Sequence, residues 1–263
     1  MNYNNLDLEY FHQFTKGHGV KVAILDSEID LSHREFEGRD IQYEEFIPST
    51  QINYHGTAIA SLIIGKDIGV APEVSLYHMK MLSDVFGSGA SWGEAIRKAM
   101  ALKVDVICMS IGTKEKLSPS MRQVLQVAME RGITILAPSG NEGKFLLRNP
   151  ANDERVLAVG GKDADGNQSA KSNKHKDIEA YALSEDVLVA NTGETFNYIK
   201  KNGTSFANAI VSGQVALIIA YARDRGYNIN VRDFLKTYNR NNPHEGKEIN
   251  MNIVKKELDN YLK

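Results

Sequence analysis

The most constraining stretch of this sequence is the apolar run FANAIVSGQVALIIAYA, which extends from Phe206 to Ala222. The run is apolar on nearly every face, so we expect a helix buried in the middle of a domain. Ser205 precedes it, at the end where unpaired amides and the helix dipole favour negative charge. Gly203, which has no Cβ, is expected to let another backbone come close. A nucleophilic serine and an ordinary Ser N-cap both fit this segment.

Around this run, short apolar segments that read as strands alternate with longer segments that read as helices. We expect strands over residues 21–26, 74–82, 104–112, 133–138, 155–161 and 178–189, and helices over residues 58–65, 92–101, 118–131 and 206–222. This alternation predicts right-handed crossovers and a three-layer α/β fold, with a mostly parallel central sheet and helices on both faces. We expect one domain over residues 1–263, in which residues 1–19 form an N-terminal arm and residues 228–263 a C-terminal surface segment.

Composition excludes little but gives no support to several classes of partner. The net charge of the 263 residues is −2, so the charge balance does not indicate nucleic acid or an anionic membrane surface. The start of the chain lacks the pattern of a secretory signal, and we expect no apolar run elsewhere to be long enough to span a bilayer. Cys108 is the only cysteine and lies in an apolar segment, which predicts a buried strand residue. We therefore expect a cytoplasmic protein; a secreted mature domain without its signal and propeptide is the alternative.

Three polar residues fall at the ends of predicted elements. Asp26 ends an apolar strand, at the sheet edge where catalytic groups collect, although such an aspartate is more often a turn or cap residue. His55 falls in the first turn of a helix, and Gly56 after it is expected to let a substrate backbone pass close to the ring. A capping or core histidine is the alternative. With Ser205, these residues supply an acid, a base and a nucleophile.

Four sequence motifs carry a resemblance to a known family. They are VAILDSEID, HGTAIASLIIG, APSGNEG and NGTSFANAIVSGQVALI. In this order and at these separations they resemble the aspartate, histidine, oxyanion-asparagine and serine motifs of the subtilisin-like serine proteases, the subtilase family. The segments VAPEVSLYHMKML, GSGAS and VICMSIG match the family between the motifs. Several dispersed motifs in register are far more specific than one.

The resemblance implies a serine endopeptidase that cuts extended polypeptides and needs no cofactor. Ser205 would attack the scissile carbonyl, His55 would take and return the proton, and Asp26 would orient the imidazole. The Asn141 side chain and the Ser205 backbone N–H would stabilise the oxyanion.

The resemblance also assigns substrate-binding residues. Two edge segments would hold an extended peptide between them as an added strand, and a third segment would form a pocket wall. These residues are Gly87, Ser88 and Gly89, then Ser110, Ile111 and Gly112, and finally Pro138, Ser139 and Gly140. Glu142 at the pocket rim predicts a preference for a basic residue before the cleaved bond.

The sequence departs from the family pattern at several positions. Glu28 replaces a glycine, and its carboxylate is expected to raise the basicity of His55 or to narrow the substrate channel. Ala209 stands where the family usually has proline. Residues 65–69 are shorter than the family's calcium loop, although Glu35 matches a distant ligand. Because calcium takes about six to eight oxygen ligands, we expect no metal there.

Several functional readings stay open at this point. No propeptide is recognisable. We therefore expect either a domain from which the propeptide has been trimmed, or an intracellular protease that folds without one or with a partner. The expected partner is a precursor or a propeptide-like inhibitor. Dedicated processing of a precursor is favoured over general protein degradation. The first alternative is a catalytically silent subtilase fold that binds a peptide or partner. The second is an esterase or amidase that acts on small acyl substrates.

Overall fold

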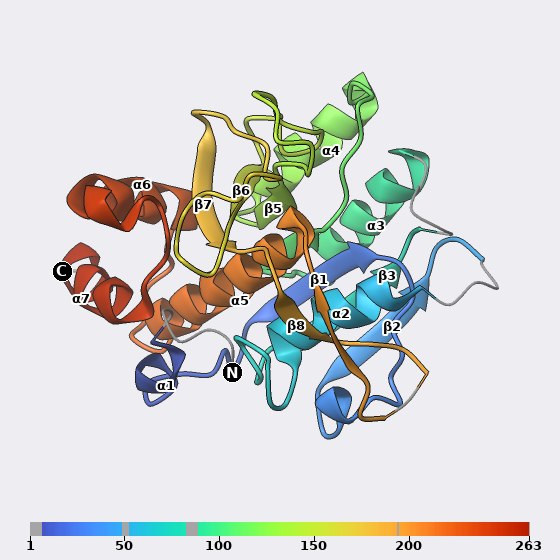
Figure 1. Ribbon diagram of the computed structural model, residues 1–263, viewed down its shortest axis with the longest axis horizontal. Helices are drawn as coiled ribbons and strands as arrows, with labels where there is room; N and C mark the ends of the chain where they lie inside the picture. The colour runs from blue at the N-terminus through green and yellow to red at the C-terminus, as the bar shows by residue number, and fades with distance from the viewer. Residues whose placement is uncertain (1–6, 49–52, 83–88, 194, 263) are drawn as a thin grey trace.

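The computed structural model describes residues 7–48, 53–82, 89–193 and 195–262. Seven parallel strands form its central sheet, in the order β2-β3-β1-β4-β5-β6-β7 (Figure 1). The strands are β1 (Lys21–Asp26), β2 (Ile41–Glu45), β3 (Ser75–Lys80), β4 (Val106–Met109), β5 (Thr134–Pro138), β6 (Leu157–Lys162) and β7 (Ile178–Leu183). The predicted parallel α/β sheet is therefore confirmed.

One predicted strand is divided between two sheets. The segment 178–189 contains β7 and the start of β8 (Val187–Ala190), and β8 pairs antiparallel with β9 (Tyr198–Lys201) in a separate two-stranded sheet. Asp186 between β7 and β8 has a left-handed φ of 49°, which ends the regular strand conformation before β8 begins.

The central strands are apolar throughout because both faces of the sheet are covered. In β1, Val22 and Ile24 belong to the core on one face, whereas Ala23 and Leu25 belong to the core on the other. Alternate residues of a strand point to opposite faces, so a strand covered on both sides must be apolar at nearly every position. This requirement explains the continuous apolar runs in the sequence.

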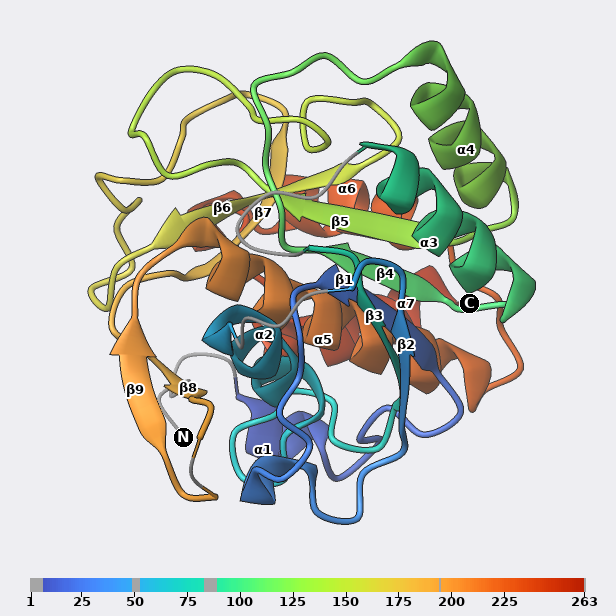
Figure 2. The same cartoon turned by 90° about the vertical axis from the view of Figure 1, so that its right-hand side faces the viewer.

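Helices cover both faces of the sheet (Figure 2). The helix α2 (Tyr54–Ile64) packs with α5 (Thr204–Arg223) on one face, and α3 (Gly89–Ala101) packs with α4 (Pro119–Glu130) on the other. The remaining helical elements are α1 (Leu8–Phe11), η1 (Arg34–Phe36), α6 (Val231–Asn241), η2 (Pro243–Glu245) and α7 (Met251–Tyr261). Ser118 caps α4 and Pro119 occupies its first position, where the missing N–H of proline costs no hydrogen bond.

The helix α5 is the buried helix that the long apolar run predicts. By length and composition, this helix could cross a membrane; it is the one such helix among the described residues. The expectation that no apolar run is long enough to span a bilayer is therefore corrected. Within its most apolar window, 94% of the residues are buried inside the protein. The helix is apolar on all sides because it lies between the sheet, α2 and the C-terminal helices.

Both ends of the described chain pack against the core beside α5 (Figure 1). In α1, the ring of Phe11 is fully buried and lies 5.4 Å from the ring of Tyr221 in α5. The helices α6 and α7 also bury one apolar face, which consists of Val231, Phe234, Leu235, Tyr238, Met251, Val254 and Leu258. Residues 228–263, expected as a C-terminal surface segment, therefore also contribute apolar side chains to the core.

If α7 is part of the core, truncating its buried face must destabilise the fold. We expect Leu258→Ala to lower the free energy of unfolding by about 2–5 kcal/mol, because it removes buried methyl groups and leaves a cavity. The control Lys256→Ala, at an exposed position of the same helix, should change it by less than about 0.5 kcal/mol. Equilibrium urea denaturation measures both, and equal small effects would show that α7 is dispensable.

Candidate active site

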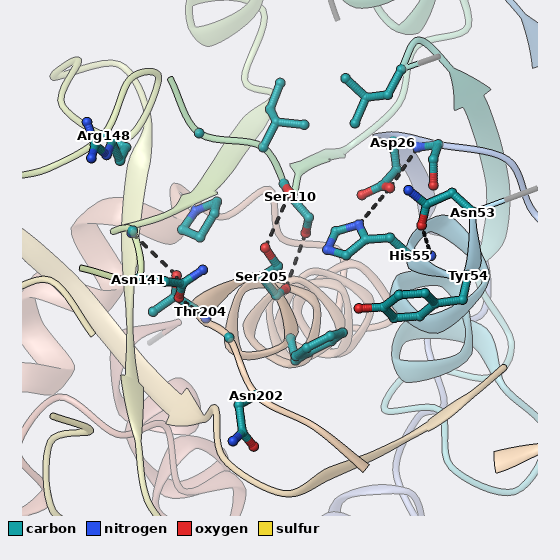
Figure 3. A pocket seen from close by; sticks show the side chains of 18 of the residues that line it. Asp26, Asn53, Tyr54, His55, Ser110, Asn141, Arg148, Asn202, Thr204 and Ser205 are labelled. Carbon is teal, nitrogen blue, oxygen red and sulfur yellow. Dashed lines mark hydrogen bonds and ion pairs between the residues drawn. The ribbon is translucent and has the colours of Figure 1, made fainter. Parts of the chain in front are cut away.

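A cleft of about 400 Å³ opens at the carboxyl edge of the sheet (Figure 3). Its lining comes from the ends of β1 and β5, the segment after β4, and the first turns of α2 and α5. Asp26, His55, Asn141 and Ser205 all line it. The four residues come from distant parts of the chain and meet because parallel strands end at one edge.

Asp26 and His55 are joined by a short hydrogen bond between their side chains. Asp26 is fully buried, and its Oδ1 lies 2.8 Å from His55 Nδ1. The carboxylate only accepts, so Nδ1 carries the hydrogen, and Oδ1 also accepts from the Ser27 N–H at 2.7 Å. Burial by itself would lower the pKa of His55, but the charge and hydrogen bond of Asp26 raise it above its ordinary value.

The first turn of α2 is fixed against the loop that follows β1. Asn53 caps the helix, and its Oδ1 accepts from the His55 N–H at 2.9 Å. The Gly56 N–H donates to Ser27 Oγ at 2.9 Å, and a Cβ at Gly56 would lie only 2.5 Å from the carbonyl oxygens of Ser27 and Glu28. Glycine is required because the chain's own backbone passes there, which corrects the expectation that the space serves a substrate.

A buried histidine in β3, His78, also contacts the loop that follows β1. His78 Nε2 donates to the Ser27 carbonyl at 2.7 Å, and the ring stacks on Tyr43. Burial lowers the pKa of His78, so the ring is neutral at neutral pH and keeps this donor. His78 thus helps to hold the backbone that carries Asp26. The sequence signal for this role is a histidine between Tyr77 and Met79, within a strand.

Ser205 is the second residue of α5 rather than its cap. The N-cap is Gly203, with φ 154° and ψ 147°, so the interpretation of Ser205 as an N-cap is wrong. A Cβ at Gly203 would meet only side-chain atoms, at 3.6 Å or more. Glycine is therefore needed at position 203 for its unusual backbone conformation. The expectation that it lets another backbone come close is not supported.

The hydroxyl of Ser205 is held by Ser110 in the cleft. It donates to the Ser110 carbonyl at 3.3 Å, and the Ser110 hydroxyl donates in return to the Ser205 carbonyl at 3.2 Å. Figure 3 shows the His55 ring in the same part of the cleft, with one ring nitrogen on the side of Ser205. The ring of Phe206 lies 5.9 Å from that of His55.

Asn141 is held against the start of α5 by its side-chain oxygen. Oδ1 accepts from the Thr204 N–H at 2.8 Å and from the Thr204 hydroxyl at 2.9 Å (Figure 3). Because the oxygen is engaged, the amide nitrogen remains as the donor of this side chain. Thr204, which sequence reasoning did not single out, therefore fixes the orientation of Asn141.

Comparison with known proteins agrees with this geometry. The sequence model of the subtilase family matches residues 17–252. The chain belongs to the subtilase family. It is 33% identical over 236 residues to the major intracellular serine protease of Bacillus subtilis, covering 82% of this chain and 73% of that protein. It is also 33% identical over 219 residues to subtilisin DY of Bacillus licheniformis, covering 78% of each. This subtilase is thus a subtilisin-like serine endopeptidase.

Solved structures show the same fold. The prenylagaramide maturation protease PagA superposes with a TM-score of 0.85 at 26% identity, covering 95% of this chain and 98% of PagA. The patellamide maturation protease PatA superposes with a TM-score of 0.81 at 25% identity, covering 92% and 98%.

The predicted substrate-binding residues of this subtilase are only partly in the cleft. Ser110, Ile111, Gly112, Pro138 and Gly140 line it. Ser139 does not: it is fully buried, and its hydroxyl lies 3.4 Å from that of Ser172 behind the wall. Gly87 and Ser88 lie outside the described residues. Gly89 begins α3, so its backbone is helical and not the extended edge that we expected.

The structure adds lining residues that sequence reasoning missed. Asn53, Tyr54, Asn202, Thr204 and Arg148 all line the cleft. The first four stand within two residues of a predicted catalytic residue or glycine turn, and this proximity could have identified them. Arg148 gives no such signal, because it lies five residues beyond APSGNEG in a segment without regular periodicity.

Glu28, which departs from the family pattern, and Glu35, which matches it, are both engaged within the chain. Glu28 lies 3.6 Å from Lys80 and is not among the groups that raise the pKa of His55, so the predicted effect on its basicity is not supported. Glu35 is buried and accepts from the amides of Asp67 and Ile68, which belong to the shortened loop. The Tyr198 hydroxyl donates to its other oxygen at 2.5 Å. Among the described residues, no cluster of three or more His, Cys, Asp or Glu could hold a metal.

The free thiol beside the site is not a nucleophile. Cys108 is fully buried in β4, as its apolar surroundings predict, and burial raises its pKa to about 11. The thiol is therefore protonated at neutral pH.

The contact between α2 and the loop after β1 can be tested with a single methyl group. We expect Gly56→Ala to lower the free energy of unfolding by about 1–3 kcal/mol and to slow reaction with a fluorophosphonate probe, because its Cβ would displace two carbonyl groups and shift His55. The matched control is Gly93→Ala in α3, where a Cβ would come no nearer than 3.5 Å to the Arg97 side chain. A tolerated Gly56→Ala would show that the contact is loose.

Proposed function

We propose that this subtilase hydrolyses peptide bonds by nucleophilic attack of Ser205, with His55 as general base and acid and Asp26 as the group that orients it. Asn141 and the Ser205 backbone N–H are the proposed oxyanion donors. The observation that carries the proposal is the 2.8 Å bond from His55 Nδ1 to the buried Asp26, in the cleft that also contains Ser205.

The proposed proton transfer follows from the tautomer of His55. With its hydrogen on Nδ1, the ring has a free lone pair on Nε2, on the side of Ser205 (Figure 3). Rotation of the Ser205 side chain about χ1 moves its hydroxyl from the Ser110 carbonyl toward this nitrogen. Catalytic hydrogen bonds are often long before substrate binds, so the observed rotamer is compatible with this role. His55 then returns the proton to the leaving amine, while Asp26 stabilises the imidazolium.

The proposed oxyanion site depends on the start of α5. The N–H of Ser205 lies in the first turn, where helix amides have no partner within the helix. Asn141, held by Thr204, places a second donor beside it. Losing one such donor costs about 10²–10³-fold in kcat, a range established on a subtilisin.

We propose a peptide or protein substrate, processed in the cytoplasm as a dedicated precursor. The likeness to PagA, a maturation protease with 26% identity over nearly its whole chain, supports processing. The likeness to the major intracellular serine protease of Bacillus subtilis supports the location. The proposed partner is therefore a precursor, or a propeptide-like segment that occupies the same cleft.

The nucleophile is tested by covalent labelling. We expect a fluorophosphonate probe to label the wild-type protein and a peptide library to be cleaved, and Ser205→Ala to abolish both while the melting temperature stays unchanged. Mass spectrometry of the labelled peptide identifies the modified residue. A folded wild-type protein that is neither labelled nor active would instead fit a silent, peptide-binding subtilase.

The pH profile tests the pairing of Asp26 with His55. The base works only when neutral, so a raised pKa places the acidic limb of kcat/KM above the pH expected for an ordinary imidazole. Asp26→Asn removes the charge that raises this pKa while burial still lowers it, so the limb should move to lower pH and kcat should fall about 10⁴-fold. Glu28→Gln is the matched control, since Glu28 faces Lys80, and the limb should stay in place. An unmoved limb in Asp26→Asn would contradict the pairing.

A further inference from the structure

One arginine occupies the part of the cleft that faces away from His55. Arg148 lines the cleft, and its side chain is only 11% exposed. Figure 3 shows Arg148 and Asn141 on one side of Ser205 and His55 on the other. No step of the proposed mechanism uses this side chain.

The stem of Arg148 fills the space between two glycine walls. A Cβ added at Gly112 would lie 3.3 Å from Arg148 Cβ, and one added at Gly140 would lie 2.8 Å from Arg148 Cγ. The first wall follows β4 and the second follows β5. The arginine stem thus packs against both glycines and narrows the part of the cleft between them.

The guanidinium is fixed by a chain of polar contacts. Arg148 donates to Glu142 Oε1 from Nε at 2.8 Å and also from Nη2. Glu142 Oε2 accepts from Asn173 Nδ2 at 2.7 Å. Asn173 is fully buried, and its Oδ1 accepts from the amides of Glu142 and Lys144 at 3.1 and 3.0 Å. Arg148 therefore cannot swing out of the cleft without breaking its pair with Glu142.

This arrangement also neutralises both charges at the pocket. Burial alone would raise the pKa of Glu142, but hydrogen bonds from Arg148 and Asn173 hold it below its ordinary value. Glu142 thus stays ionised and paired at neutral pH. The expected preference for a basic residue before the cleaved bond loses its basis, because this carboxylate already has a cation.

The proposed mechanism defines which substrate residue meets Arg148. His55 must reach the leaving nitrogen, so the leaving segment lies on its side of Ser205. The scissile carbonyl lies between Ser205 and Asn141. The side chain of the residue that supplies this carbonyl therefore points to the opposite side, where Arg148 lies.

We propose that Arg148 restricts the residue before the cleaved bond to a small uncharged side chain, such as that of glycine, alanine or serine. This inference rests on the proposed function, because it uses the mechanism to orient the substrate. Large apolar side chains are excluded by the arginine stem. Basic side chains are disfavoured because Glu142 is already paired with Arg148, and acidic side chains are disfavoured because Arg148 is already paired with Glu142.

The test compares peptides that differ only at this residue, with Ala, Phe, Arg or Asp before the cleaved bond. In the wild-type enzyme we expect kcat/KM for Ala to exceed that for Phe by about 10–100-fold. Arg148→Gly removes the stem, so the Ala-to-Phe ratio should fall by about the same factor. Arg148→Met keeps the stem without the charge and should retain the preference for Ala. Glu142→Gln leaves the guanidinium unpaired and should raise cleavage after Asp.

Labelling with the fluorophosphonate probe separates the possible failures. The probe reacts with the nucleophile and carries no side chain that enters the Arg148 pocket. Normal labelling together with equal wild-type rates for Ala and Phe would overturn the specificity inference alone, whatever any variant does. An unchanged Ala-to-Phe ratio in a labelled Arg148→Gly enzyme would overturn it too. Absence of wild-type labelling would overturn the proposed function, and the inference with it.

Discussion

The close approach of the loop after β1 to the first turn of α2 is the contact on which the rest of the site depends. Ser27 accepts from the amide of Gly56 through its hydroxyl and from His78 through its carbonyl. The backbone at Ser27, next to Asp26, is thereby held by α2 and by β3. Their 2.8 Å hydrogen bond follows from this packing, because the contact sets the distance between the two backbone segments that carry them.

The buried helix α5 supplies the opposite side of the cleft. Its apolar length is set by burial between the sheet and the surrounding helices, so its position along the core is fixed. Its first turn opens at the carboxyl edge of the sheet, where Ser205 and Thr204 face the segments after β4 and β5. The proposed nucleophile, Ser205, and the residue that orients Asn141, Thr204, are thus neighbours in one rigid helix.

Two carboxylates show how this chain pairs charged groups with its own donors. Glu35 is buried and accepts from two amides of the shortened loop and from Tyr198. A buried carboxylate is costly unless it is paired or hydrogen-bonded, so these contacts stabilise that loop. Glu142, whose side chain is 35% exposed, accepts from Arg148 and Asn173, and this contact shapes the cleft because the paired arginine lines it.

The sequence alone determined the elements of the fold and the family, because burial on both faces makes a strand continuously apolar and burial on all sides does the same for α5. The motifs around Asp26, His55, Asn141 and Ser205 could be predicted, since each stands at the end of such an element. Only the tertiary structure decided what these residues touch. The reason why Gly56 must be glycine depends on the path of another loop. The burial of the C-terminal helices depends on α5, with which they pack. The position of Arg148 between Gly112 and Gly140 depends on how the segments after β4 and β5 pack together. Hydrophobic periodicity in the sequence shows which face of an element is buried, but it does not show which residues cover that face.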